Sequence, residues 1–92
     1  IWGALYDESR RRKFLTNVSN PTQKATNLNS WNEFRIRAEG DVITIWINGA
    51  LATRYFENAS ESKIPRNGRF GLQIHSGPPA EAWYKDIQIK EL

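Results

Sequence analysis

Apolar and polar residues alternate along the middle of the chain, and this alternation predicts β-strands over residues 32–39 and 42–47. Successive side chains of a strand point to opposite faces, so each pattern gives one buried face and one polar face. Thr44 and Trp46 fall on the polar face. The expected core set is Ile43, Ile45 and Ile47, and Phe34, Ile36 and Ala38 form the face of the preceding strand that is expected to be buried.

Turn signals separate the strands. Gly40-Asp41 and Asn48-Gly49 tolerate positive φ and predict two consecutive hairpins, and Pro78-Pro79 ends a later strand. A β-bulge near Lys85-Asp86 would place Tyr84 and Ile87 on one side of the last strand. The six expected strands cover residues 1–6, 32–39, 42–47, 50–56, 69–75 and 81–91.

Two polar segments are expected to connect these strands. Residues 7–30 predict a long loop, with a short helical turn near residues 7–14 as an alternative, and residues 57–68 predict a second connection. No segment has helical apolar spacing over the length of a helix. The prediction is therefore an all-β antiparallel sandwich with one layer and part of another.

Composition restricts the function classes. The 92 residues form at most one small domain, and the absence of cysteine excludes disulfides and thiolate metal sites. The net charge is +3, and the basic run at residues 10–13 follows Asp7 and Glu8, which partly neutralise it. We therefore expect no nucleic-acid partner, and without an apolar run of roughly 20 residues we expect no membrane span.

The segment Gly71-Leu72-Gln73-Ile74-His75-Ser76-Gly77-Pro78-Pro79 contains the chain's single histidine. Gln73 and His75 share the polar face of the expected strand. A neutral imidazole that faces a cleft transfers protons near pH 7, whereas an exposed or structurally hydrogen-bonded histidine does not. Both interpretations of His75 stay open at this point.

Several motifs in this order resemble the 3-keto-disaccharide hydrolase family. They are Gly3-Ala4-Leu5-Tyr6-Asp7-Glu8-Ser9-Arg10-Arg11, Trp31-Asn32-Glu33, Trp46-Ile47-Asn48-Gly49, the segment of residues 71–79, and Asp86-Ile87-Gln88-Ile89-Lys90-Glu91-Leu92. The resemblance implies a bacterial, periplasmic or extracellular protein with a concanavalin-like jelly-roll fold. It also implies that residues 1–92 are about the C-terminal half of a domain, whose other half is a separate chain, has been lost to cleavage or is replaced by self-association.

The resemblance implies cleavage of the glycosidic bond of 3-keto-glycosides by removal of the C2 proton, elimination and hydration. We expect His75 and Glu8 to be the catalytic pair, and Asp7 to pair with the arginines that follow it. Each has a non-catalytic alternative, since a solvated acidic pair at the end of a strand is common. The residues expected to bind substrate are Tyr6, Asp7, Arg11, Arg35, Trp46 and Gln73.

Three further alternatives stay open. Trp46 with Arg35 and Arg37 predicts a platform for stacking a sugar, although tryptophan also packs structurally. A divalent metal is an alternative for the carboxylates, but one histidine without a spacing motif is a weak metal signal. The whole chain is either part of an enzyme, a carbohydrate-binding module without turnover, or an interaction domain that pairs through a sheet edge.

Overall fold

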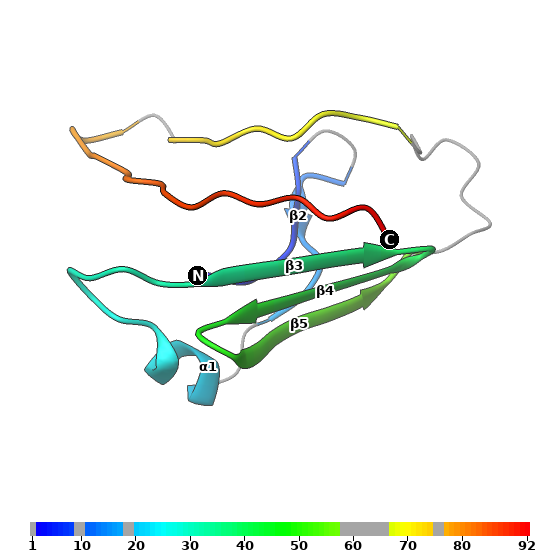
Figure 1. Ribbon diagram of the computed structural model, residues 1–92, viewed down its shortest axis with the longest axis horizontal. Coiled ribbons are helices and arrows are strands. Elements are labelled where there is room, and N and C mark those ends of the chain that lie inside the picture. The colour runs from blue at the N-terminus through cyan, green and yellow to red at the C-terminus, as the bar shows by residue number, and fades with distance from the viewer. Residues whose placement is uncertain (1, 9–10, 18–19, 58–66, 75–76) are drawn as a thin grey trace. The chain divides into compact units, whose positions relative to one another are not determined.

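The computed structural model describes residues 2–8, 11–17, 20–57, 67–74 and 77–92. The chain divides into two units, Ile1–Glu61 and Ser62–Leu92. In the first unit, β1 (Tyr6–Asp7) pairs with β2 (Lys13–Phe14), and a short helix follows, α1 (Asn20–Ala25). A three-stranded antiparallel sheet completes the unit, with β3 (Phe34–Glu39), β4 (Val42–Ile47) and β5 (Ala50–Phe56) in that order (Figure 1).

The predicted meander is confirmed. β3 pairs with β4 in a regular register, and the two-residue turn at Asn48 and Gly49 has φ values of 49° and 82°, as a tight hairpin of this kind requires. The Asn48 side chain also accepts a hydrogen bond from the Glu33 amide at 2.8 Å and donates one to the Ala25 carbonyl at 2.7 Å. Asn48 therefore joins the turn to the chain that enters β3 and to the end of α1.

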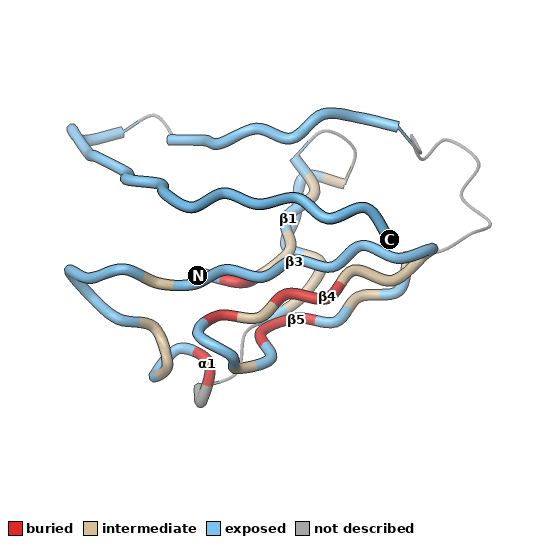
Figure 2. The backbone as a smooth tube through the Cα atoms, in the orientation of Figure 1, coloured by how far each residue is buried: buried red, intermediate tan, exposed pale blue. Residues whose placement is uncertain are grey.

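The core lies on one face of the sheet, where the isoleucines of β4 were predicted. Ile45 and Ile47 are buried together with Ala52 of β5, and Ala4 and Ile43 pack against them. The register between β4 and β5 shifts between Ile45 and Trp46, so β5 has one extra residue there. Figure 2 shows the buried residues concentrated on β4 and β5.

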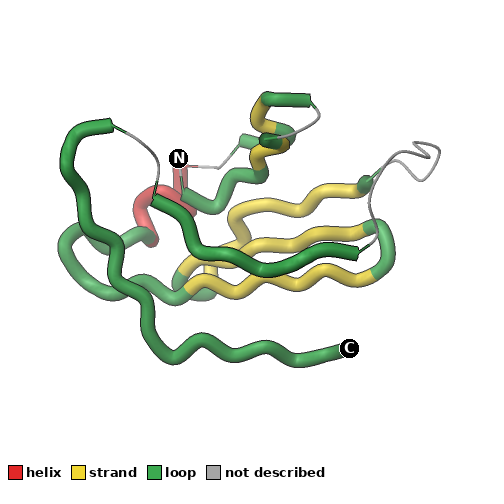
Figure 3. Tube along the Cα trace, turned by 90° about the horizontal axis from the view of Figure 1, so that it is seen from above, coloured by secondary structure: helices red, strands yellow, loops and turns green. Residues whose placement is uncertain are grey.

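Threonine hydroxyls tie the N-terminal segment and α1 to this core face. Thr53 donates to the Gly3 carbonyl at 2.6 Å, and its hydroxyl lies 2.9 Å from that of Thr16, which accepts from the Leu5 amide. Thr22 of α1 donates to the Leu51 carbonyl at 2.8 Å. The β1–β2 hairpin and α1 therefore lie on the same side of the three-stranded sheet, as Figure 3 shows from above.

Two predictions for residues 1–30 are wrong. Residues 2–5 form no strand, because Gly3 has a φ of 83° and breaks the extended backbone, so pairing is confined to Tyr6 and Asp7. A helical turn is absent from the described residues between 7 and 14, where Lys13–Phe14 is β2. The helix comes later, at α1, where Pro21 occupies the first turn and its missing N–H costs no hydrogen bond.

The expected burial of the β3 residues Phe34, Ile36 and Ala38 is also wrong, since all three are exposed. Alternation correctly places them on the core face, opposite Ile47, Ile45 and Ile43. However, Gly3 of the N-terminal segment packs against Ile47 of β4 and Ala52 of β5, and β3 lies at the far edge of the sheet from β5. Only Phe34 gains an aromatic neighbour, Trp2, with ring centroids 5.9 Å apart.

In the second unit, the described residues 67–74 and 77–92 form no strand. Their alternating apolar side chains are exposed, and Tyr84 donates a hydrogen bond to the Gln73 carbonyl at 3.2 Å. Asp86 has a φ of 53°, at the position of the predicted bulge, but no ladder forms beside it within the described residues. The part of the chain that the structure describes is thus mostly β with two small antiparallel sheets, and the sandwich stays a prediction.

Candidate functional site

Arg11 joins two carboxylates that are far apart in sequence. Its Nη1 donates to Asp7 Oδ2 at 3.3 Å, and its Nη2 donates to Glu57 Oε1 at 2.7 Å. All three side chains are largely shielded from water, with Arg11 and Glu57 only 18% and 12% exposed. Charge-assisted hydrogen bonds of this kind are stronger than neutral ones and also hold the two partners in a defined geometry. The cluster therefore attaches the β1–β2 hairpin to the chain that leaves β5.

Glu57 is a site residue that the sequence analysis missed. It follows β5 directly, and its amide donates to the Asp41 carbonyl at 2.7 Å, beside the turn between β3 and β4. The sequence contained no local signal for it, because its partner Arg11 lies 46 residues earlier.

Tyr6 and Glu8 are exposed on the hairpin, as are Arg12, Lys13 and Phe14. The Tyr6 ring packs edge-on against Phe14 of β2, with centroids 5.0 Å apart and an angle of 67° between the planes. Glu8 is the residue after β1, next to the carboxylate that Arg11 binds. The structure therefore separates the acidic pair into a bound Asp7 and an exposed Glu8.

Arg35 and Trp46 form a second group. They are directly opposite each other on β3 and β4, and the Arg35 guanidinium lies 5.4 Å from the centre of the indole. Arg54 lies over the Phe56 ring in a similar way, at 5.7 Å. Cation–π pairing orders an arginine while leaving N–H groups available for a ligand.

The two groups lie on opposite faces of the sheet. Trp46 alternates with the buried Ile45 and Ile47, so its side chain points away from the core face. The hairpin with Tyr6 and Asp7 is held over the core face by the threonine bonds to Gly3 and Thr16 (Figure 3). The structure therefore brings Asp7 and Arg11 together, and Arg35 and Trp46 together, but it does not join the two pairs in one cleft.

The remaining predicted site residues belong to the second unit. Gln73 is exposed, and its carbonyl accepts the Tyr84 hydroxyl. His75 lies outside the described residues. Within the described part of the chain, no group of three or more histidine, cysteine, aspartate or glutamate side chains is positioned to hold a metal ion. No helix in that part is long and apolar enough to cross a membrane.

Substitutions at Arg11 and Glu57 test whether this cluster stabilises the hairpin. We expect Glu57→Gln to lower the free energy of unfolding by about 1 kcal/mol. Because Glu57 and Arg11 belong to one shielded network, the coupling energy between Glu57→Gln and Arg11→Met should be roughly 0.5–3 kcal/mol. Urea unfolding of the four proteins of a double-mutant cycle gives both values.

The control is the ion pair between Arg37 and Glu39, which is 2.6 Å long but 48% and 61% exposed. Its coupling energy should stay within about 0.5 kcal/mol, because water screens exposed pairs. Equal coupling energies in the two cycles would show that shielding from water does not strengthen the interaction between Arg11 and Glu57.

These observations define a β-rich domain with an arginine–carboxylate cluster on one side of its sheet and an arginine–tryptophan pair on the other. The model of the 3-keto-alpha-glucoside-1,2-lyase-like domain matches residues 1–90, so the chain belongs to that family. No curated protein and no solved structure matches the chain.

Proposed function

We propose that the chain is part of a carbohydrate-active enzyme that cleaves the glycosidic bond of 3-keto-glycosides, including 3-keto-disaccharides. The observation that supports this proposal most directly is the family match over residues 1–90. The proposal includes a concanavalin-like sandwich, in which β3, β4 and β5 belong to one layer. It also includes a periplasmic or extracellular location, which rests on the family alone.

The chemistry follows from the ketone at C3 of the sugar. The ketone acidifies the hydrogen on C2, so a base removes that proton and an enolate forms. The C1–O bond then breaks, the leaving oxygen takes a proton, and water adds to the resulting enone. The protein has to supply a base at C2, an acid at the leaving oxygen and a hydrogen-bond donor for the enolate oxygen.

We assign the base and acid roles to His75 and Glu8. Glu8 is suited to contact a substrate because it is exposed, whereas Asp7 beside it is bound by Arg11. Tyr6 is exposed on the same hairpin and offers a ring and a hydroxyl to a sugar. Its packing against Phe14 limits the entropy that it loses on binding.

The geometry favours a positioning role for Arg11. Both of its terminal nitrogens donate to carboxylates, so it holds the residues next to Glu8 in place. Asp7 shares this role. Arg35 and Trp46 remain candidates for contact with a sugar on the other face of the sheet, and Gln73 remains a candidate hydroxyl ligand in the second unit.

The test compares oxidised with ordinary disaccharides. We expect the purified protein to release glucose from 3-ketotrehalose or 3-ketomaltose and to leave trehalose and maltose intact, because only the ketone acidifies C2. In D₂O, the recovered 3-keto substrate should contain deuterium at C2. Binding of the 3-keto sugar without cleavage or exchange would contradict the enzyme and support a carbohydrate-binding module instead.

A further inference from the structure

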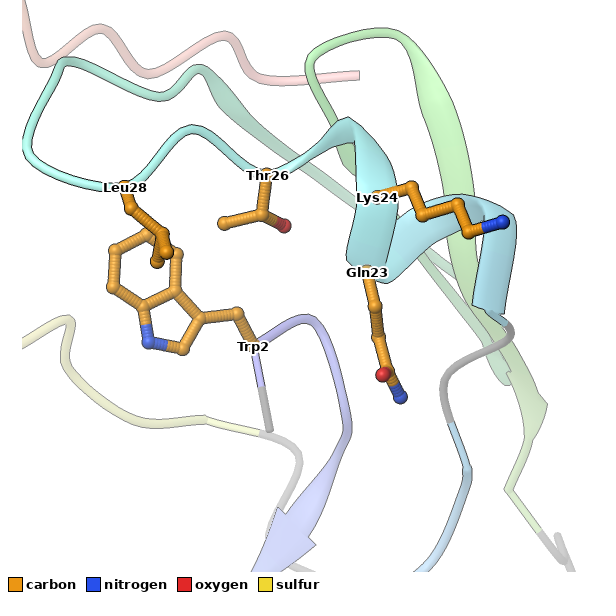
Figure 4. A pocket seen from close by; sticks show the side chains of 5 residues that line it. All are labelled: Trp2, Gln23, Lys24, Thr26 and Leu28. Carbon is orange, nitrogen blue, oxygen red and sulfur yellow. The ribbon is translucent and has the colours of Figure 1, made fainter.

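An open groove lies on the core side of the first unit, between the N-terminal segment and α1. It has a volume of about 440 Å³ and is lined by Trp2, Gln23, Lys24, Thr26 and Leu28. Trp2 and Leu28 occupy one end and Gln23 and Lys24 the other, with Thr26 between them (Figure 4). The volume falls within the roughly 300–1,000 Å³ of small-molecule sites.

Trp2 is held rigidly although its side chain is 54% exposed. Gly3 is wedged against the core so tightly that a Cβ on it would lie 2.6 Å from Ala52 Cβ. The Gly3 carbonyl also accepts the 2.6 Å hydrogen bond from Thr53, and the indole contacts Phe34. The fold thus fixes a large aromatic surface in contact with water, which prepares it to stack on a ligand.

The other end of the groove offers the neutral amide of Gln23 and the neutral hydroxyl of Thr26 beside the charged Lys24. The Gln23 amide both donates and accepts hydrogen bonds. The Thr26 hydroxyl donates to the Thr22 carbonyl at 3.3 Å and so retains its capacity to accept. A pyranose ring matches this lining, since one face presents C–H groups to an indole and its rim presents hydroxyls that bond to the amide and hydroxyl.

We propose that this groove binds one glucopyranose ring of an α-glucoside, stacked on Trp2 and hydrogen-bonded to Gln23 and Thr26. The inference extends the proposed function, because Trp2 lies on the same side of the sheet as Tyr6. Trp2 and Tyr6 are four positions apart in the chain, so their Cα atoms lie at most about 14 Å from each other. One disaccharide that binds in the groove therefore reaches toward the hairpin. The ring in the groove would be the one that is not oxidised.

The test uses maltose, which lacks a ketone, so its binding is independent of turnover. We expect the indole N–H signal of Trp2 in a ¹⁵N–¹H NMR spectrum to shift as maltose is added, and not to shift with glycerol, which has no ring face. Trp2→Ala should weaken binding roughly tenfold or more, and Trp2→Phe should retain most of it. Gln23→Ala, at an exposed position of α1 where alanine favours the helix, should weaken binding severalfold.

The matched control is Phe56→Ala, which removes an exposed aromatic ring on the opposite face of the sheet and should leave maltose affinity unchanged. An unshifted Trp2 signal, or affinity lost in Phe56→Ala and retained in Trp2→Ala, would overturn the proposal. If Trp2→Ala does not fold, unchanged affinity in Gln23→Ala overturns the proposal as well. Maltose binding at Trp2 without cleavage of 3-keto sugars would keep this inference and refute the proposed function.

Discussion

Replacement of Gly3 by alanine is expected to lower the free energy of unfolding by about 2–4 kcal/mol. Two costs add. Gly3 has a φ of 83°, a backbone conformation that alanine rarely adopts. The new Cβ would also lie 2.6 Å from Ala52 Cβ and 2.8 Å from Ile47 Cδ1. Ile47 is fully buried, so its side chain cannot move out of the way into solvent. The shift of the urea unfolding midpoint measures the sum.

Gly49→Ala provides the control that separates the two costs. Gly49 has nearly the same φ, 82°, but a Cβ there would meet nothing within 4 Å. This variant should therefore lose only the backbone term, about 1 kcal/mol. Adding Ala52→Gly to Gly3→Ala should recover part of the loss, because it removes the nearest clashing atom. Equal losses in the two single variants would mean that the contact at Gly3 relaxes at little cost.

The β3–β4–β5 meander could be predicted from the sequence because its determinants are local. Alternation along β4 assigned Ile45 and Ile47 to one face and Trp46 to the other, and Asn48-Gly49 specified the hairpin turn. The burial of β3 could not be predicted in the same way. Alternation assigns Ile36 to a face, but whether that face is covered depends on segments elsewhere in the chain.

The candidate site shows the same division between local and distant determinants. The pairing of Asp7 with Arg11 could be predicted from the sequence, because a carboxylate just before a run of arginines is well placed to pair with one of them. Glu57 contributes the shorter of the two bonds to Arg11 and had no signature, because the hairpin and the end of β5 meet only in three dimensions. For the same reason, the sequence did not reveal that Trp46 and the hairpin face opposite ways.

Loss of the single histidine is the prediction with the largest expected effect on activity. If His75 transfers a proton in the cleavage of 3-keto-glycosides, His75→Ala should lower kcat roughly 10²–10⁴-fold while the fold is retained. The neighbouring residues 71–74 are exposed. Added imidazole should restore part of the rate, because it replaces the missing proton carrier.

The pH profile distinguishes a base from a merely structural histidine. A base must be neutral, so the wild-type kcat/KM should rise with pH through the titration of the imidazole, and His75→Ala should lack this rise. Gln73→Ala, two residues away, is the matched variant: as a hydroxyl ligand it should raise KM and leave the pH profile unchanged. If His75→Ala retains kcat within about twofold, the proton transfers belong to other groups, and Glu8→Gln then becomes the decisive variant.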